Sequence, residues 1–159
     1  MAFDCFLKIK DIPGESTDAA HKDWIELQSF QLGAHQNVST ASTGGARSTG
    51  RVNWSEAVAT KTVDKASTKL FLALGKGTHI AECTVDICRA TGEKQKYMGY
   101  KLEDVLISSV QNGGTGGGIA TELVSFSFSS SLISSADAKG TFSSVSACGA
   151  ASFEGLNKR

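Results

Sequence analysis

Hydrophobic and polar residues alternate over several stretches of the chain, and this period of two predicts a protein built mainly of β-strands. In Phe3–Ile9 (FDCFLKI) every second residue is apolar on one face, as in a half-buried strand. The same kind of pattern predicts further strands, the last of them weak, over Trp24–Gly33, Val52–Val63, His79–Arg89, Lys96–Val110, Glu122–Ile133 and Thr141–Cys148.

The alternation changes phase within Trp24–Gly33 (WIELQSFQLG). Its apolar residues fall on odd positions up to Leu27 and on even positions from Phe30. A slip of one residue exchanges the two faces of a strand, so the sequence predicts a β-bulge or sharp coil near Gln28–Ser29. In the long strand Lys96–Val110 the sequence suggests a break near Glu103–Asp104.

One stretch has the spacing of an α-helix, and we predict a short helix over about residues 67–76. Ser67 is a suitable N-cap, and Gly75 or Gly77 supplies the C-terminal end. A helix of this length depends on packing against a sheet, which we expect from Leu70, Phe71 and Leu74. Its apolar stripe comprises Ala66, Leu70, Phe71, Ala73 and Leu74.

A polar segment rich in Ser, Thr and Gly lies before the third predicted strand and has no hydrophobic period. We predict a long protruding loop over about residues 37–51. A loop of this length in a small domain is usually a binding loop or disordered. With 159 residues, the chain is expected to form one mainly-β domain, residues 1–159, with a single flanking helix.

Charge and composition narrow the classes of function. Lys plus Arg and Asp plus Glu number 16 each, and this balance argues against a nucleic acid as the main partner. A net charge near zero also weakens repulsion between copies, which favours self-association. No stretch is long and apolar enough to cross a membrane as a helix, so we expect no membrane insertion.

The N-terminal residues lack the basic and apolar regions of a signal peptide, so we expect synthesis in the cytoplasm and any export without a cleavable signal. Four cysteines are present, without zinc-type spacing, and are expected to be reduced and mostly buried. They are Cys5, Cys83, Cys88 and Cys148.

No arrangement of residues predicts an active site, a metal site or a cofactor. The GKGT stretch at Gly75–Thr78 lacks the first glycine and the preceding strand of a phosphate-binding loop. The three histidines have no ligand spacing. Hydrolase-type residues gather between the first two strands, but no strained turn presents the serine. We therefore interpret Gly14, Glu15 and Ser16 as a structural turn.

The strand Glu122–Ile133 has one face built from small hydroxyl side chains, those of Ser125, Ser127 and Ser129, opposite an apolar face. Such a face is smooth and hydrated. It suits a water-filled channel or a close contact between subunits at least as well as an ordinary solvent face.

Taken in order, these segments resemble the haemolysin-coregulated protein (Hcp) family, the tube proteins of type VI secretion. The resemblance covers roughly residues 2–133 and includes every predicted element up to that point. It is carried by FDCFLKI, the Gly-Glu-Ser turn with Asp18 and His21, IELQSFQLG, DKAS before the helix, LEDVLISSV, the glycine linker and ELVSFSFS. Two departures are Thr68, where the family often has proline, and the segment from Ser134, which differs from the usual closing strand.

The resemblance implies a tight β-barrel of two sheets with one flanking helix. It further implies that six subunits form a ring, that rings stack into a tube driven by a contractile sheath, and that the lumen carries effector proteins. Sheath, spike and effector proteins are then the expected partners of a secreted bacterial structural protein without enzymatic activity. An extra toxic domain is not expected, since the chain ends soon after its last clear strand.

Candidate residues follow from combining this resemblance with the strand pattern. For the lumen they are Ser29, Gln31, Ser125, Ser127 and Ser129. For contacts between stacked rings they are Asn37, Ser39, Thr43, Arg47 and Arg51. The lumen assignment of Gln31 requires that its side chain lie outside the barrel core. An alternative of another class is a secreted, non-enzymatic adhesin or binding module with a serine-rich surface.

Overall fold

Strands make up most of the structure, a computed structural model that describes residues 3–40, 47–89, 95–136, 142–148 and 154–156, with side chains for 3–38, 51–89 and 95–135. Ten strands and one helix lie in this part of the chain. In order they are β1 (Phe3–Ile9), β2 (Ile25–Gln31), β3 (Ala34–Thr40), β4 (Arg47–Trp54), β5 (Ala57–Thr62), α1 (Ser67–Lys76), β6 (Ile80–Arg89), β7 (Gln95–Gly113), β8 (Thr121–Ala136), β9 (Phe142–Cys148) and β10 (Glu154–Leu156).

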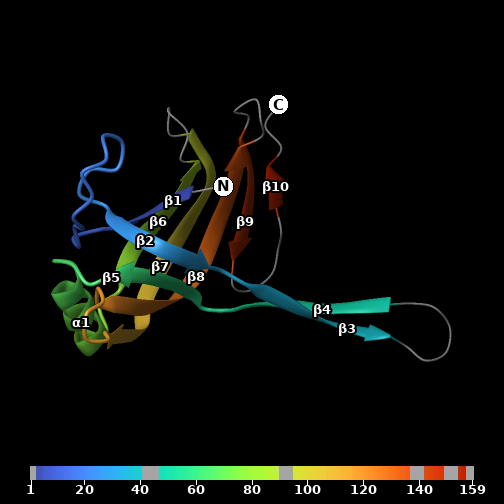
Figure 1. Ribbon diagram of the computed structural model, residues 1–159. Coiled ribbons are helices and arrows are strands. Elements are labelled where there is room, and N and C mark those ends of the chain that lie inside the picture. The colour runs from blue at the N-terminus through green and yellow to red at the C-terminus, as the bar shows by residue number, and fades with distance from the viewer. Residues whose placement is uncertain (1–2, 41–46, 90–94, 137–141, 149–153, 157–159) are drawn as a thin grey trace.

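Six strands close into a barrel, in the order β5-β2-β1-β6-β7-β8, because β8 pairs with β7 on one side and with β5 on the other. All these pairings are antiparallel. Beyond residue 129, β8 pairs with β9 instead of β5, and β10 then pairs with β9. The helix lies on one side of the barrel, and a separate two-stranded sheet, β3–β4, extends from the opposite side (Figure 1). The predicted mainly-β barrel with two sheets and one short helix is confirmed.

The predicted phase change in β2 is a β-bulge. Leu27 pairs with Lys61 of β5, but the next pair joins Ser29 to Thr60, so Gln28 is the extra residue. Before the bulge Leu27 is buried, and after it Phe30 packs partly against the core. The bulge therefore keeps apolar residues inward on both sides of the slip.

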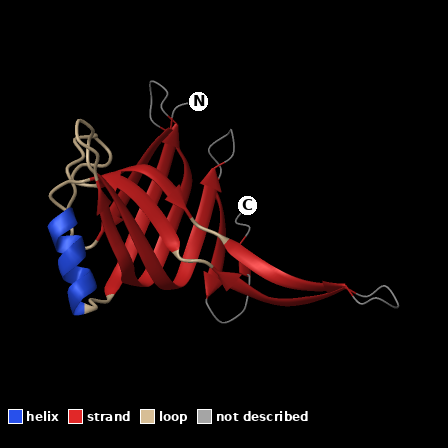
Figure 2. Cartoon of the chain, turned by 60° about the horizontal axis from the view of Figure 1, so that its bottom comes forward, coloured by secondary structure: helices blue, strands red, loops and turns tan. Residues whose placement is uncertain are grey.

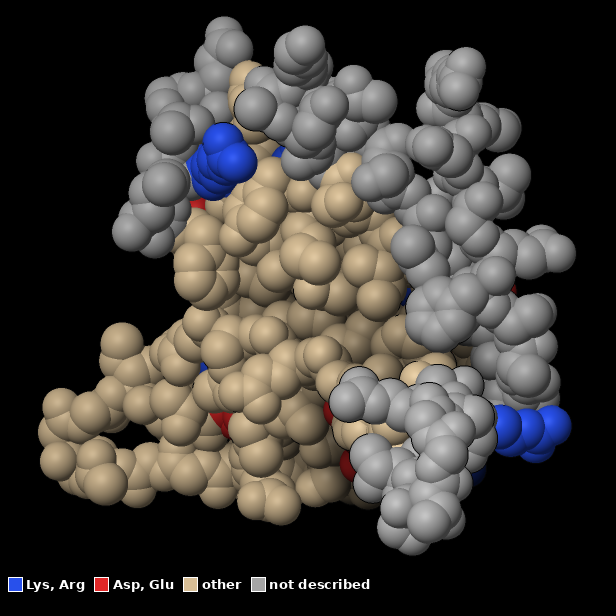
Figure 3. Space-filling view, turned by 90° about the vertical axis from the view of Figure 1, so that its right-hand side faces the viewer, with Lys and Arg blue, Asp and Glu red and all other residues tan. Residues whose placement is uncertain are grey.

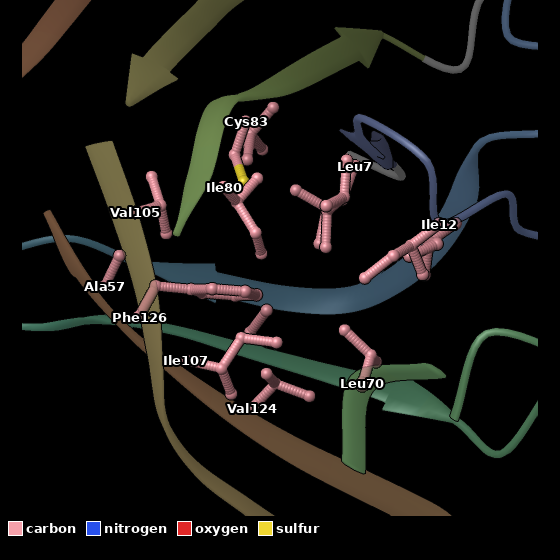
Figure 4. Packing of buried hydrophobic residues seen from close by; sticks show 14 of the residues in the cluster. Leu7, Ile12, Ala57, Leu70, Ile80, Cys83, Val105, Ile107, Val124 and Phe126 are labelled. Atoms are coloured by element: carbon pink, nitrogen blue, oxygen red, sulfur yellow. The ribbon is translucent and has the colours of Figure 1, made fainter. Parts of the chain in front are cut away.

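Apolar side chains from every barrel strand and from α1 meet in one core. Phe126 of β8 and Leu70 of α1 both point into it, together with Leu7 of β1 (Figure 4). Leu70 has no exposed surface, and Phe126 is 1% exposed. Burial of large side chains such as these contributes roughly 2–3 kcal/mol each, which makes the barrel interior the main source of stability.

The helix α1 has the predicted bounds, and Gly77 ends it in the left-handed conformation with φ 59° and ψ 41°. The prediction that Ser67 is the N-cap is wrong. Ala66 occupies that position, without a side-chain cap. Asp64 lies just before the helix and accepts a hydrogen bond from the Ala66 amide at 2.9 Å, while the Ser67 hydroxyl accepts one from the Asp64 amide at 3.1 Å.

One narrow face of α1 is buried, through Leu70, Ala73 and part of Leu74. The predicted packing of Phe71 against a sheet is wrong, since Phe71 is 43% exposed and its neighbour Leu72 is 55% exposed. Successive helical residues are about 100° apart, so a stripe centred on Leu70 turns Phe71 toward solvent.

The predicted loop at residues 37–51 is largely a β-hairpin. The antiparallel pairing of β3 with β4 begins where Ala34 faces Trp54 and ends where Thr40 faces Arg47. It has one irregularity between Gln36 and Val38. The described side chains of β3 are all exposed, Val38 at 53%. Because neither face of β3 is buried, its sequence has no alternation, and this is why pattern reasoning missed it. The end of β4, from Val52, lies within the predicted strand Val52–Val63.

The long strand β7 is continuous from Gln95 to Gly113. Asp104 is nevertheless irregular, because its φ is +49°, a conformation that costs free energy for a residue other than glycine. The break suggested near Glu103–Asp104 is therefore wrong, and the site holds only a local backbone feature within one strand.

Candidate assembly surfaces

The β3–β4 hairpin is the most prominent surface feature. It projects away from the barrel (Figures 1 and 2), and Asn37 and Arg51 on it are exposed. Ser39 and Arg47 lie in its strands, but their side chains are outside the described set, as is the whole of Thr43. A two-stranded ribbon alone is marginally stable in water, so this hairpin is suited to contacts with another molecule.

The five residues predicted for the lumen lie on the outer face of one part of the barrel. Strand register aligns Gln31 with Val58 of β5, and Val58 with Ser125 of β8. Ser29 aligns in the same way with Thr60 and through it with Leu123, on the same face. The register of β8 then continues this face to Ser127 and Ser129.

These residues differ in exposure. Gln31, Ser127 and Ser129 are exposed, Ser29 is half-buried and Ser125 is 9% exposed. Gln31 thus meets the condition that it lie outside the barrel core. The Ser129 hydroxyl donates a hydrogen bond to Asp104 at 2.8 Å.

The aligned rows on this face carry no charge, because Gln31–Val58–Ser125 and Ser29–Thr60–Leu123 contain only neutral side chains. Seen from the side on which the hairpin projects, the described surface also shows few Lys, Arg, Asp or Glu side chains (Figure 3). These rows combine polar side chains with the apolar Val58 and Leu123, and a neutral surface does not strongly attract a charged molecule of either sign.

The turn between β1 and β2 is held by backbone bonds. The Gly14 amide donates to the Asp23 carbonyl at 2.8 Å, and the Ser16 amide donates to the Trp24 carbonyl at 3.0 Å. A Cβ atom on Gly14 would lie 2.3 Å from that Trp24 oxygen, so only glycine fits. Glu15 accepts a hydrogen bond from the Lys65 amide at 3.0 Å, which ties the turn to the segment before α1.

His21 anchors the same loop to the barrel. Its ring stacks on Phe6 with centroids 4.3 Å apart, and its two nitrogens lie 2.9 Å from Asp18 and 3.3 Å from Asp86. Lys96 of β7 contacts the other oxygen of Asp86 at 2.6 Å. The Ser16 hydroxyl accepts a hydrogen bond from the Asp18 amide at 3.3 Å. These polar residues act as loop anchors.

A buried ion pair joins β5 to β8, and sequence reasoning missed it. Lys61 and Glu122 are register partners, have no exposed surface and are 2.8 Å apart. Lys61 also contacts Asp64 at 2.7 Å, and the Ser67 hydroxyl donates to Glu122 at 2.7 Å. A signal was present, because both charges occupy the inward phase of their strands.

Within the described residues no group of three or more His, Cys, Asp or Glu side chains is arranged to hold a metal ion. Cys5 and Cys83 are buried free thiols, and Cys88 is buried as well. Burial, the largest cause, raises the pKa of Cys5 and of Cys83 to about 12, so both stay protonated and unreactive at neutral pH. Cys148 has no described side chain. Among the described residues, no helix has the length and apolar character that crossing a membrane requires.

A closed six-stranded barrel with a flanking helix, a projecting hairpin and a neutral serine-rich face defines a small structural β-barrel protein. Residues 6–134 match the family described as "Type VI secretion system effector, Hcp". The chain belongs to this Hcp family, whose members are structural tube proteins of type VI secretion. The resemblance seen in the sequence is thereby confirmed.

Known relatives agree in sequence and in fold. Protein hcp1 of Pseudomonas aeruginosa is 37% identical over 118 residues, which are 74% of this chain and 72% of that protein. A solved type six secretion system protein is 30% identical with a TM-score of 0.85, over 92% of this chain and 96% of that one. Hcp1 from Salmonella typhimurium is 28% identical with a TM-score of 0.80, over 93% and 95% of the two chains.

Proposed function

We propose that six copies of this chain close into a ring, that the rings stack into a tube, and that the lumen carries and protects effector proteins during export. Membership of the Hcp family supports this proposal most directly. The chain is made in the cytoplasm and leaves the cell through the secretion machine. Its partners are further copies of itself and the sheath, spike and effector proteins.

The hairpin makes the contact between stacked rings in this proposal. Asn37 and Arg51 are exposed on it, and the apolar Val38 is 53% exposed. A ring requires a heterologous interface, in which one patch of a subunit meets a different patch on the next. The projecting hairpin is then left to reach a subunit of the neighbouring ring.

The lumen wall in this proposal is the outer face of β2, β5 and β8. Gln31, Ser127 and Ser129 are exposed there, and the rows of paired residues are neutral. A neutral, hydrated wall of small side chains holds a protein cargo weakly, so cargo can be retained in the tube and still be released. Catalysis plays no part in this function.

The experiment shortens the hairpin where its two strands are paired. Residues 37–51 are replaced by Asn-Gly, which joins Gln36 to its register partner Val52 through a two-residue hairpin turn. Native mass spectrometry should still show six subunits, while electron micrographs should show rings but few tubes. Loss of the ring itself would refute the stacking assignment, and an unmodified chain that stays monomeric would refute the whole proposal.

A matched pair of point variants separates a specific contact from a general effect of added charge. Val38→Lys places a charge on the hairpin, and Ile119→Lys places the same charge on the exposed β7–β8 connector, where Ile119 is 80% exposed. We expect only Val38→Lys to reduce tube formation. Equal reduction by both variants would show that the hairpin has no special part in stacking.

A further inference from the structure

A groove lies between α1, residues 10–12 just after β1, and the start of β6. The helix α1 lies on the other side of the barrel from the hairpin (Figure 2). It has a volume of about 380 Å³. Its floor is apolar, formed by Ile12, Ala73 and Ile80, all less than 9% exposed. Leu72 of α1 lines it as well and is 55% exposed. This volume and lining are typical of sites that receive one or two side chains of a partner.

Lysines surround this apolar floor. Lys10, Lys69 and Lys76 line the groove, and Asp11 is the one carboxylate among the described residues that do so. Lys69 reaches only the backbone carbonyl of Asp11, at 3.5 Å. Among the described residues, neither Lys10 nor Lys76 forms an ion pair with a carboxylate. The groove therefore carries a local excess of positive charge, although the formal net charge of the whole chain is zero.

His79 adds little to this excess. It lines the groove, but its Nδ1 lies 2.8 Å from a carboxylate oxygen of Asp104, which is outside the lining. That carboxylate is ionised near neutral pH, because hydrogen bonds from His79 and then from Ser129 lower the pKa of Asp104. Any positive charge on His79 is thus balanced locally, and the lysines remain the unbalanced groups.

We propose that this groove binds an acidic peptide segment of a partner protein, with one leucine-sized side chain on the apolar floor and carboxylates on the lysines. The three lysines are flexible point charges, which suit carboxylates at variable positions along a peptide. The helix contributes its C-terminal half here, through Ala73 and Lys76. The buried apolar floor suits a peptide with an apolar side chain better than a free phosphate.

The residues that line the groove include none of the hairpin and none of the five lumen candidates, although Asp104 joins His79 of the groove to Ser129. The inference does not require ring formation or stacking. The test uses the full chain and a fluorescein-labelled peptide, Ser-Asp-Glu-Leu-Glu-Asp-Ser, with fluorescence anisotropy as the readout. Two companion peptides replace the acids by Asn and Gln, or the leucine by serine. We expect saturable binding of the first peptide that weakens with added salt, and weaker binding of both companions.

Charge reversals identify the site. Lys69→Glu and Lys76→Glu should each weaken binding by about threefold or more, the effect expected when an exposed ion pair becomes a repulsion. Lys22→Glu changes the net charge equally but lies on the loop before β2, outside the groove, and should leave the affinity unchanged. Leu72→Ser should also weaken binding, whereas Phe71→Ser, an exposed neighbour outside the lining, should not.

Three results would overturn the inference. The first is no saturable binding of the acidic peptide up to about 1 mM, the weak end of specific recognition. The second is equal weakening by the groove variants and by Lys22→Glu, which would indicate general electrostatics. The third is self-association of the chain that Lys69→Glu abolishes, which would make a second copy the occupant.

Discussion

Removing Lys61 alone should destabilise the barrel far more than removing it together with Glu122. Both side chains are fully buried, and the Lys61 ammonium contacts Glu122 at 2.8 Å and Asp64 at 2.7 Å. In Lys61→Met the Glu122 carboxylate keeps one bond, from the Ser67 hydroxyl, and its Oε1 atom has no hydrogen-bond partner among the described residues. Breaking a buried pair on one side costs about 3–5 kcal/mol, because the remaining charge is desolvated without compensation.

The double variant Lys61→Met/Glu122→Leu removes both charges from the interior. Apolar replacements of similar volume are often neutral for stability, so most of the loss in the single variant should be recovered. Asp64 should tolerate the change, since its side chain still accepts the Ala66 amide at 2.9 Å. The difference between single and double variants measures the cost of an unpaired buried charge rather than the loss of packing.

The assay is equilibrium unfolding in urea, at one protein concentration for all variants because assembly makes stability depend on concentration. A loss of about 4 kcal/mol moves the midpoint by about 2 M if the slope is about 2 kcal/mol per M. Lys101→Met is the control, since Lys101 forms an exposed pair with Glu82 at 3.1 Å and should barely move the midpoint. A Lys61→Met midpoint equal to that of the control, or a double variant as unstable as the single, would refute the reasoning.

Two further predictions concern the turn before β2 and the exposed carboxylate in β7. Gly14→Ala should lower the free energy of unfolding by about 2 kcal/mol, because the added Cβ would clash with the backbone. Gly75→Ala should raise it by up to about 1 kcal/mol, because a Cβ there meets open space in the helix. Urea midpoints of the two variants that move in the same direction would contradict this. Hydrogen bonds lower the pKa of Asp104 below 3.8, so its stabilising effect is present above that pH and is lost as pH falls through the lower folded-state pKa. Melting temperatures measured from about pH 5 to pH 2 should therefore fall less steeply for Asp104→Asn than for the unchanged chain, and parallel curves would contradict the assignment.

The barrel strands could be predicted from sequence because one face of each is buried within the same chain. The pattern was sensitive enough to place the bulge of β2 next to Leu27, where the register with β5 changes by one residue. The same reasoning placed the helix at Ser67–Lys76 but assigned Phe71 to the interior. Which face of the helix carries Phe71 toward solvent depends on how α1 is rotated against the barrel, and contacts distant in sequence decide that rotation.

The buried ion pair was missed for a different reason. An alternating pattern treats charged residues as exposed, and Lys61 lies next to exposed-looking threonines at the end of β5. Its burial depends on Glu122, sixty-one positions later and directly opposite in the register. Partners this far apart can be paired only after the strand order is known, and the order of the strands did not follow from the sequence.

Residues whose partners lie on another molecule leave the weakest pattern of all. Strand β3 of the hairpin shows no alternation, because its described side chains are exposed on both faces of the isolated chain. An isolated ribbon of two strands gains little from burial, so its hydrogen bonds compete with water and it is marginally stable alone. If rings stack as proposed, the neighbouring ring supplies the missing layer. Stacking then stabilises the folded hairpin, so that folding of the hairpin and stacking of rings are coupled in one equilibrium. The hairpin would then exchange its amide hydrogens quickly in free rings and slowly in tubes, while barrel strands such as β1 would exchange slowly in both.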